Sequence, residues 1–136
     1  MWYALAGVLL LSGIVLLYVT SIINQPTLIS TAYGQQSIAF QNENIDVLVA
    51  DTDEKRIQGL SGRSELPAGF EGMLFIFDEP GFHGIWMKDM LIPIDIYWLD
   101  EQFEIIDQEM NVSPDTFPET FTPDAPAKYV LEIPAG

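Results

Sequence analysis

The pattern of apolar and polar residues divides the chain into two unlike parts. Residues 2–23 contain no Asp, Glu, Lys or Arg, and the first charged side chain is that of Glu43. At helical rise this apolar run has a length of about 33 Å, compared with about 30 Å for the hydrocarbon core of a bilayer. We therefore predict a transmembrane helix within residues 1–23, which contacts the membrane through residues 2–23 and acts as a single-pass signal anchor.

A cleaved secretory signal is the alternative, because the small residues of the Ser30-Thr31-Ala32 stretch suit a signal peptidase. The apolar run is, however, longer than the core of about 7–15 residues that such signals carry, and no basic residue precedes it. A helix buried in a soluble fold is disfavoured because the polar remainder offers little to cover it. Lys and Arg residues near a membrane helix keep their segment in the cytoplasm, and this chain has few of them, the first being Lys55. We therefore expect the domain after the helix to be extracytoplasmic.

An uncharged linker follows the apolar run. Residues 24–36 are rich in Gln, Pro, Thr, Ser and Gly, a composition that is typical of flexible connections. The remaining residues contain no internal repeat, and their number suits one domain. We assign residues 24–36 to a linker and residues 37–136 to a single domain.

Short β-branched runs bounded by turn formers predict the first strands of this domain, at about residues 37–41 and 45–50. A short helix is predicted next, in the stretch "DTDEKRIQGLSG". Asp51 or Thr52 can cap its start, with Glu54 at the capping-box distance from Asp51. Gly59 or Gly62 can end it.

The later apolar runs also predict strands. "GMLFIFDEPG" is unbroken and ends on a Pro-Gly signal, which indicates a strand that is buried on both faces. "GIWMKD", "IPIDIYWLD" and "QFEIIDQEM" alternate in part, and Asp100-Glu101-Gln102 suits a hairpin between the last two. A Pro-rich loop at residues 113–126 precedes a final strand in "AKYVLEIPAG". We predict an α+β domain, mostly β and barrel-like, with one short helix.

Charge and composition narrow the possible partners. All 20 acidic and all five basic residues lie at or after Glu43, giving this part a formal charge of −15, which repels nucleic acid. An acidic surface that only keeps the protein soluble would carry the same formal charge. The chain has no Cys, which excludes disulfides and thiolate catalysis, and His83 is its single histidine. No phosphate-cradling or calcium-loop motif is present, so we expect no nucleic acid partner, no cofactor and no metal.

The stretch "GIWMKDMLIPIDIYWLD" places three charged residues, Lys88, Asp89 and Asp95, among large apolar side chains. Strand alternation predicts that Trp86, Lys88 and Met90 share one face, while Ile85, Met87 and Asp89 share the other. Pro93 interrupts the register before Asp95. Asp95 can then form a structural ion pair with Lys88 or Arg63, or take part in a site.

Aromatic residues in the same stretch leave a second choice open. Trp86, Tyr97 and Trp98 can line a groove for a sugar or peptide, or they can fill the core, as aromatic residues in strands usually do. No reaction class stands out from these residues alone.

Four blocks, "RIQGLSGRSEL", "GMLFIF", "WMKDMLIPIDIYWLD" and "PAKYVLEIPAG", occur in this order over roughly residues 40–136. They resemble the DUF192 family of small bacterial and archaeal proteins. The resemblance implies a compact, β-rich α+β barrel and an exported or membrane-anchored location, without an established activity. The family pattern falls on Arg56, Gly59, Leu60, Arg63, Leu66, Gly72, Met73, Leu74, Phe75, Trp86, Met87, Lys88, Pro93, Asp95, Leu131, Glu132 and Gly136.

Two departures from the family pattern affect these expectations. Asp89 and Met90 stand where relatives usually have Asn and Thr, which alters any ligand contact made there. The family pattern also continues through a further helix and strand beyond its "LE-x-x-AG" block, whereas this sequence stops at Gly136. The resemblance then implies either that the C-terminal end is missing, which we favour, or that a partner protein supplies a strand at the open sheet edge.

Three hypotheses of function follow. The leading one is a membrane-anchored, extracytoplasmic, non-enzymatic module that binds a small molecule, sugar or peptide near Arg63, Trp86, Lys88 and Asp95. The alternative is a hydrolase-type enzyme in which Asp95 or Asp89 is the base and Lys88 or Arg63 stabilises negative charge. In the third, the charged residues only hold the sheet and the domain is a structural part of an assembly.

Overall fold

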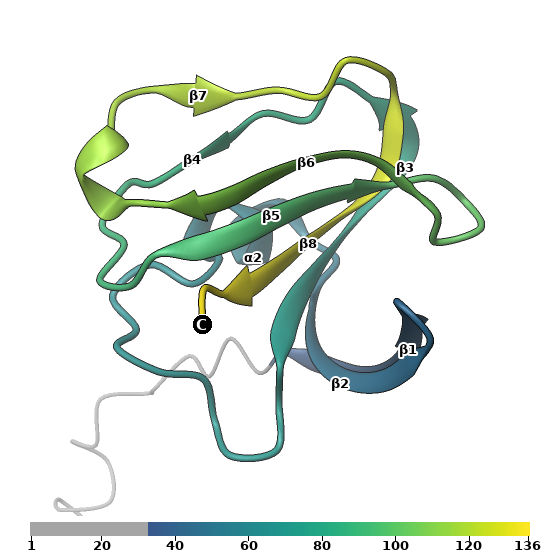
Figure 1. Cartoon of the computed structure of the whole chain (residues 1–136), viewed down its shortest axis with the longest axis horizontal. Coiled ribbons are helices and arrows are strands. Elements are labelled where there is room, and N and C mark those ends of the chain that lie inside the picture. Colours follow the sequence, from purple (N-terminus) through teal and green to yellow (C-terminus); the bar gives the residue numbers. More distant parts are fainter. Residues whose placement is uncertain (1–32) are drawn as a thin grey trace, which may run out of the picture. The chain divides into compact units, whose positions relative to one another are not determined.

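The computed structural model describes residues 33–136 (Figure 1). The predicted transmembrane helix at residues 1–23, and the linker except for residues 33–36, lie outside the described residues. Within the described part, no helix combines the length and the apolar character that a membrane crossing requires.

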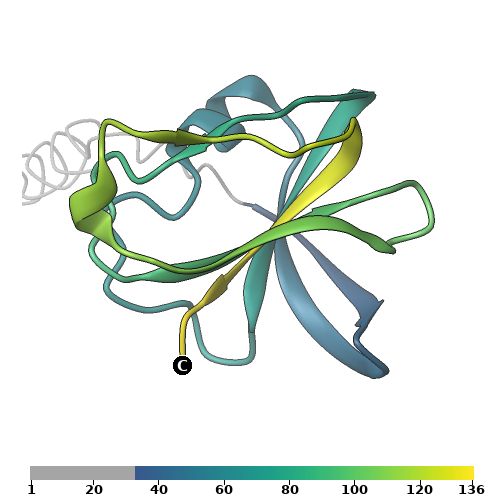
Figure 2. The same cartoon turned by 45° about the horizontal axis from the view of Figure 1, so that its top comes forward.

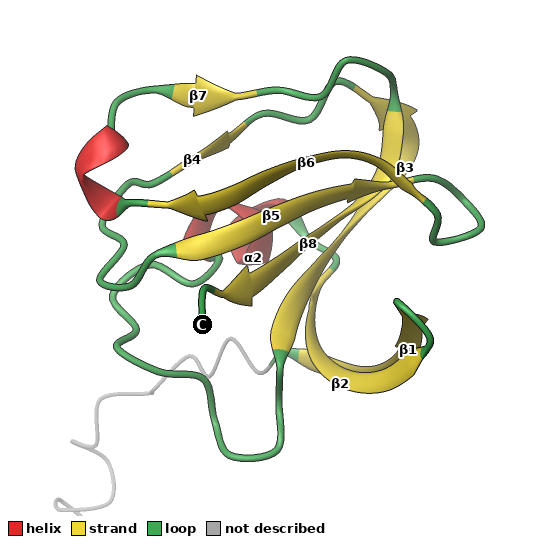
Figure 3. Cartoon of the chain, in the orientation of Figure 1, coloured by secondary structure: helices red, strands yellow, loops and turns green. Residues whose placement is uncertain are grey.

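The described residues form a mostly β domain with one short α-helix (Figure 3). The elements in chain order are β1 (Gly34–Phe40), β2 (Glu43–Ala50), α2 (Asp53–Gln58), β3 (Gly72–Gly81), β4 (Ile85–Trp86), β5 (Ile94–Leu99), β6 (Ile105–Val112), a 3-10 helix η1 (Pro114–Thr116), β7 (Thr120–Phe121) and β8 (Ala127–Pro134). The predicted α+β class with a single α-helix is confirmed for this part of the chain.

Six strands form one sheet in the order β1-β2-β3-β8-β5-β6, and β4 pairs with β7 in a separate two-stranded sheet. All neighbours are antiparallel except β2 and β3, whose parallel pairing requires the crossover connection that contains α2. The predicted barrel-like sheet is not a closed barrel, because β1 and β6 are the two ends of the sheet and do not pair with each other. The sheet is instead strongly twisted and open (Figures 1 and 2).

Local sequence signals explain the connections. Gln41 and Asn42 both have positive φ, 49° and 68°, as the two central residues of a type I′ hairpin turn require between β1 and β2. The predicted hairpin after β5 also forms. There the Oδ1 of Asp100 accepts hydrogen bonds from the backbone N–H groups of Gln102 and Glu104, at 2.8 and 2.9 Å.

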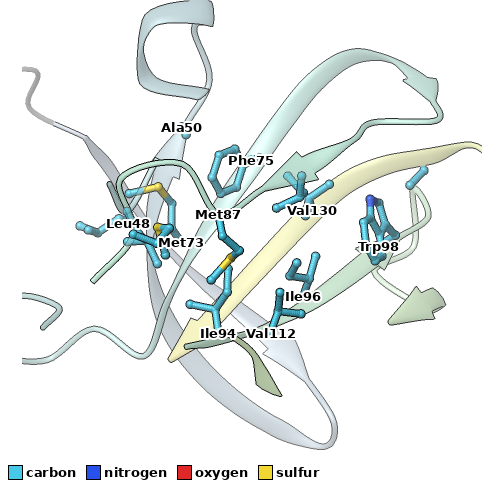
Figure 4. Close-up of a cluster of buried hydrophobic side chains, with 14 residues drawn as sticks. Leu48, Ala50, Met73, Phe75, Met87, Ile94, Ile96, Trp98, Val112 and Val130 are labelled. Carbon is cyan, nitrogen blue, oxygen red and sulfur yellow. The ribbon is translucent and has the colours of Figure 1, made fainter. Parts of the chain in front are cut away.

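Both faces of the central strands are buried. On one face, a cluster that includes Met73, Phe75, Ile96 and Trp98 is partly covered by the segment of β4 (Figure 4). On the other face, the sheet curls on itself, so that Phe40 of β1 lies 4.9 Å from Tyr97 of β5, ring centroid to ring centroid, although these strands are not neighbours. This double burial explains the unbroken apolar runs of the sequence.

The alternation predicted after Gly84 is met only in part. Ile85 and Met87 are buried while Trp86 and Lys88 are exposed, as expected. The strand itself ends at Trp86, and the next residues turn, with Asp89 at φ 56°. Met90 therefore points into the core instead of sharing the exposed face of Lys88.

Candidate functional site

A hollow of about 380 Å³ lies beside α2 and is lined by residues of β3, β4 and β8 as well. Most of its lining is apolar, with the side chains of Ile57, Phe75, Phe77, Ile85, Trp86 and Met90. A second hollow of about 300 Å³ adjoins it and includes Lys88 and Asp89. The two share part of their lining, including Ile57, Ser61 and Trp86, so we treat them as one continuous groove.

Helix α2 forms one wall of the groove. Thr52 is its N-cap, and the Thr52 Oγ1 accepts a hydrogen bond from the Lys55 N–H at 3.3 Å. The helix ends at Gly59, whose φ of 47° is in the left-handed region. A Cβ there would also lie 3.2 Å from the Cζ of Phe75, so the glycine lets the helix end approach the core closely.

Arg56 joins this wall to β3. Its Nη2 donates to Oδ1 of Asp53 and its Nη1 donates to the carbonyl oxygen of Ile76, both at 2.6 Å. Its guanidinium carbon also lies 5.2 Å from the ring centroid of Phe77. The charge of Arg56 is therefore already matched at the mouth of the hollow.

The opposite wall carries the most exposed aromatic side chain of the groove. Trp86 is 49% exposed, and the Nζ of Lys88 lies 5.7 Å from its ring centroid. The turn after Trp86 is held in place by hydrogen bonds from the Ser61 hydroxyl to the Lys88 carbonyl oxygen at 2.9 Å, and from the Gly62 N–H to the Asp89 carbonyl oxygen at 2.8 Å. Asp89 suits this turn because aspartate tolerates a positive φ better than most residues.

Glu132 of β8 also lines the hollow, although the sequence alone did not predict it as a ligand contact. Its carboxyl is 5% exposed, and its Oε2 is buried without a hydrogen-bond partner among residues 33–136. Burial raises the pKa of this carboxyl from an ordinary value of 4.5 to about 8. At neutral pH the hollow therefore contains a protonated carboxylic acid. The available signal was one acidic residue in the apolar strand "YVLEI".

Arg63 lies beside Tyr33 at the start of the described chain. Its guanidinium carbon is 5.5 Å from the Tyr33 ring centroid, and the Tyr33 hydroxyl donates to the Gly59 carbonyl oxygen at 3.2 Å. Burial raises the pKa of Tyr33, although the Arg63 charge opposes this shift. Arg63 thus supports the segment at the end of α2, and it does not line the groove.

Asp95 does not line the groove. Its Oδ1 accepts a hydrogen bond from the Asn111 backbone N–H at 2.7 Å, which ties β5 to the end of β6. Within residues 33–136 the salt bridges are Lys55 to Asp51 and Arg56 to Asp53, both at 2.6 Å. The ion pair of Asp95 with Lys88 or Arg63, one of the two roles expected for Asp95, does not form in this part of the chain, where its carboxylate accepts the Asn111 N–H instead.

The contacts of His83 indicate a structural role. Its ring stacks on Phe77 at 3.5 Å between centroids, and its Nε2 lies 3.1 Å from the Glu79 carbonyl oxygen. Burial lowers its pKa. Across residues 33–136, no group of three or more His, Asp or Glu side chains is placed to hold a metal ion.

Comparison with known proteins gives one family and two solved structures. The model of the DUF192 family, described as an uncharacterized ACR, matches residues 36–136. A crystal structure of a "putative transcription regulator" from Sinorhizobium meliloti 1021 is 28% identical with a TM-score of 0.66, over 79% of this chain and 85% of that one. A protein of unknown function from Novosphingobium aromaticivorans DSM 12444 is 23% identical with a TM-score of 0.66, over 82% and 81%. No curated protein matches the chain.

Proposed function

The chain belongs to the DUF192 family, and from that premise we propose that its domain is a non-enzymatic module that binds a small ligand in the groove beside α2. The observation that carries the proposal is Glu132, a buried carboxyl whose Oε2 has no partner in the described chain and which lines a hollow of about 380 Å³. An unsatisfied buried polar group costs about 1–3 kcal/mol, and a ligand that supplies the missing hydrogen bond recovers part of this cost.

The shape and chemistry of the groove suit a small ligand. Volumes of roughly 300–1,000 Å³ are typical of such sites, and they combine apolar walls with a few polar groups, as this groove does. Trp86 is 49% exposed, and Ile57 on the facing wall is 73% exposed. Covering these two side chains with the apolar part of a ligand would be favourable.

Charge favours a polar or anionic group near Lys88. The domain is strongly acidic, yet Lys88 lines the groove over the Trp86 ring and has no salt bridge within residues 33–136. The other groove cation, Arg56, is paired with Asp53. Of the four residues predicted as ligand contacts, we retain Trp86 and Lys88 in the groove and give Arg63 a supporting role. Asp95 lies outside the proposed contact surface.

The description of the Sinorhizobium structure as a "putative transcription regulator" does not lead us to propose DNA binding for this chain. A chain with five basic and 20 acidic residues repels the phosphate backbone. The hydrolase alternative is also less well supported. The carboxylate of Asp95 already accepts a backbone hydrogen bond, and Asp89 lies in a tight turn.

Location and partners complete the proposal. The charge-free run at residues 2–23 supports a single-pass anchor with the domain on the extracytoplasmic side. Resistance of the full-length protein to carbonate extraction would support the anchor, and release would contradict it. The edges of β1 and β6, which are unpaired within residues 33–136, support a second role as a docking edge for a partner strand.

The test of the ligand site is a thermal-shift screen of the purified full-length chain against sugars, short peptides and carboxylate metabolites. A true ligand should raise the melting temperature, and Trp86→Ala and Lys88→Gln should each reduce its affinity. Phe82→Ala is the matched control, because Phe82 is 61% exposed but does not line the groove. Equal loss in Phe82→Ala, or no ligand in the screen, would contradict the proposal.

A further inference from the structure

Glu132, the buried carboxyl that lines the groove, lies in the central part of the sheet. Glu132 stands between β3 and β5, opposite Met73 on one side and Ile96 on the other. Both neighbours belong to the buried apolar cluster, as does Val130, two residues earlier on the same face of β8. A carboxyl in this position has apolar side chains around it and the hollow in front of it.

We propose that the groove recognises an uncharged, carboxamide-like group through the carboxyl of Glu132, an inference that rests on the proposed ligand site. A carboxylic acid presents one O–H donor and one carbonyl acceptor side by side. A carboxamide presents the complementary acceptor and donor, so the two groups can form a pair of parallel hydrogen bonds. Oε2 is buried and has no partner among the described residues, and rotation of the carboxyl about its terminal torsion would turn it toward the hollow, where such a pair would satisfy it.

Surrounding charges do not favour an ionised ligand group at this position. The charged residues that line the same hollow are Asp53 and Arg56, and these are paired with each other at 2.6 Å. Arg63 and Tyr33 contact each other without lining the hollow, and Tyr33 is near enough to Glu132 for the Glu132 charge to contribute to its raised pKa. The lining from β3 and β4 carries no charged side chain. While Glu132 is protonated, an ionised ligand group would thus be desolvated without an opposite charge to compensate it.

The protonation state agrees with this geometry. Burial alone raises the pKa of Glu132 to about 8, so the carboxyl retains its O–H donor at neutral pH. Above that pH the carboxyl ionises, loses the donor and becomes a buried anion. A carboxamide then loses one hydrogen bond, whereas a cationic ligand gains an ion pair.

Three probes of matched size separate the possible ligand classes. Benzamide, benzoate and benzylamine share one aromatic ring and differ in the charge of the attached group. Their affinities for the full-length chain are to be measured by ligand-observed NMR from pH 6 to pH 9. We expect benzamide to bind at pH 7 and to lose about tenfold in affinity by pH 9, because the protonated fraction of Glu132 falls by about that factor.

Glu132→Gln is the informative variant. Glutamine keeps a donor and an acceptor in nearly the same volume but does not titrate, so benzamide should still bind and the loss at pH 9 should disappear. Glu132→Met removes both polar atoms, and benzamide should lose affinity at every pH. A circular dichroism spectrum equal to that of the parent protein establishes that each variant is folded.

Each of the other outcomes would overturn the inference. Benzylamine that binds more tightly as the pH rises to 8 would overturn the inference in favour of an amine site. Benzoate that binds better than benzamide would overturn it in favour of an anion site. If screened ligands bind through Trp86 while benzamide does not, the inference fails and the proposed ligand site stands. If no compound binds, both fail.

Discussion

Replacing Glu132 with Gln should make the protein more stable, and the gain should grow with pH. The folded protein keeps the Glu132 proton up to a pH of about 8, whereas the unfolded chain releases it near 4.5. Between these values the folded state binds one more proton than the unfolded state does. The free energy of unfolding therefore falls by about 1.4 kcal/mol per pH unit from this group alone.

The magnitude follows from the two pKa values. The cost of Glu132 is about 1 kcal/mol at pH 5, about 3 kcal/mol at pH 7 and about 5 kcal/mol above pH 8, where it becomes constant. Gln cannot ionise and avoids this cost. The other acidic residues are common to both proteins and cancel in the difference between them. Any constant effect of the amide is the same at every pH, so it cancels in the change of this difference with pH.

Urea unfolding of the parent protein and of Glu132→Gln at pH 5, 7 and 9 measures this difference. The stability gap should widen by about 2 kcal/mol from pH 5 to pH 7 and by a further 1–2 kcal/mol to pH 9. Glu119→Gln is the control, since Glu119 is exposed and its variant should show no comparable trend. A gap that does not change with pH would refute the reasoning, because it would mean that Glu132 is ionised in the folded state at pH 5.

Three further changes test how the fold is held together, each by urea unfolding. Thr52→Ala should cost about 1 kcal/mol by removing the cap of α2, and Thr52→Ser should cost much less; equal losses would contradict the capping role. Trp98→Phe should cost about 2–4 kcal/mol of stability, because the fully buried indole fills core volume and its Nε1–H donates to the His83 carbonyl oxygen at 2.7 Å. A loss below about 1 kcal/mol would contradict the role of this hydrogen bond. Gly72→Ala should cost about 1–3 kcal/mol or prevent folding, since the new Cβ would lie 2.5 Å from the Glu132 carbonyl oxygen; an unchanged midpoint would show that β8 can shift.

Much of the sheet could be predicted from local patterns. The strands at Glu43–Ala50 and Gly72–Gly81 follow from apolar runs bounded by turn formers, and the start and end of α2 follow from Thr52 and Gly59. These signals are local, so one sequence contains them. An open edge was expected from the resemblance, but which strands form the edges could not be predicted, because whether β1 meets β6 depends on the twist of the whole sheet.

The site was predicted less completely, for a related reason. Trp86 and Lys88 were predicted as contacts because a cation and an aromatic ring stand together in an otherwise acidic domain, and both line the proposed groove. The burial of Glu132 depends on β8 lying between β3 and β5, and sequence spacing does not reveal that strand order. Asp95 was misread as a partner for a cation, since the bond from its carboxylate to the Asn111 N–H arises only when β6 pairs with β5.

The place of β8 in the sheet bears on how the protein is made. It is the last strand of the described chain, yet it separates β3 from β5. During synthesis, the earlier strands leave the ribosome with an empty position between them, and their apolar faces stay uncovered until β8 arrives. Contacts over such sequence distances form slowly. The apolar faces of the nascent chain are therefore most exposed to aggregation before β8 joins the sheet, and the residues of the groove walls are synthesised before Glu132.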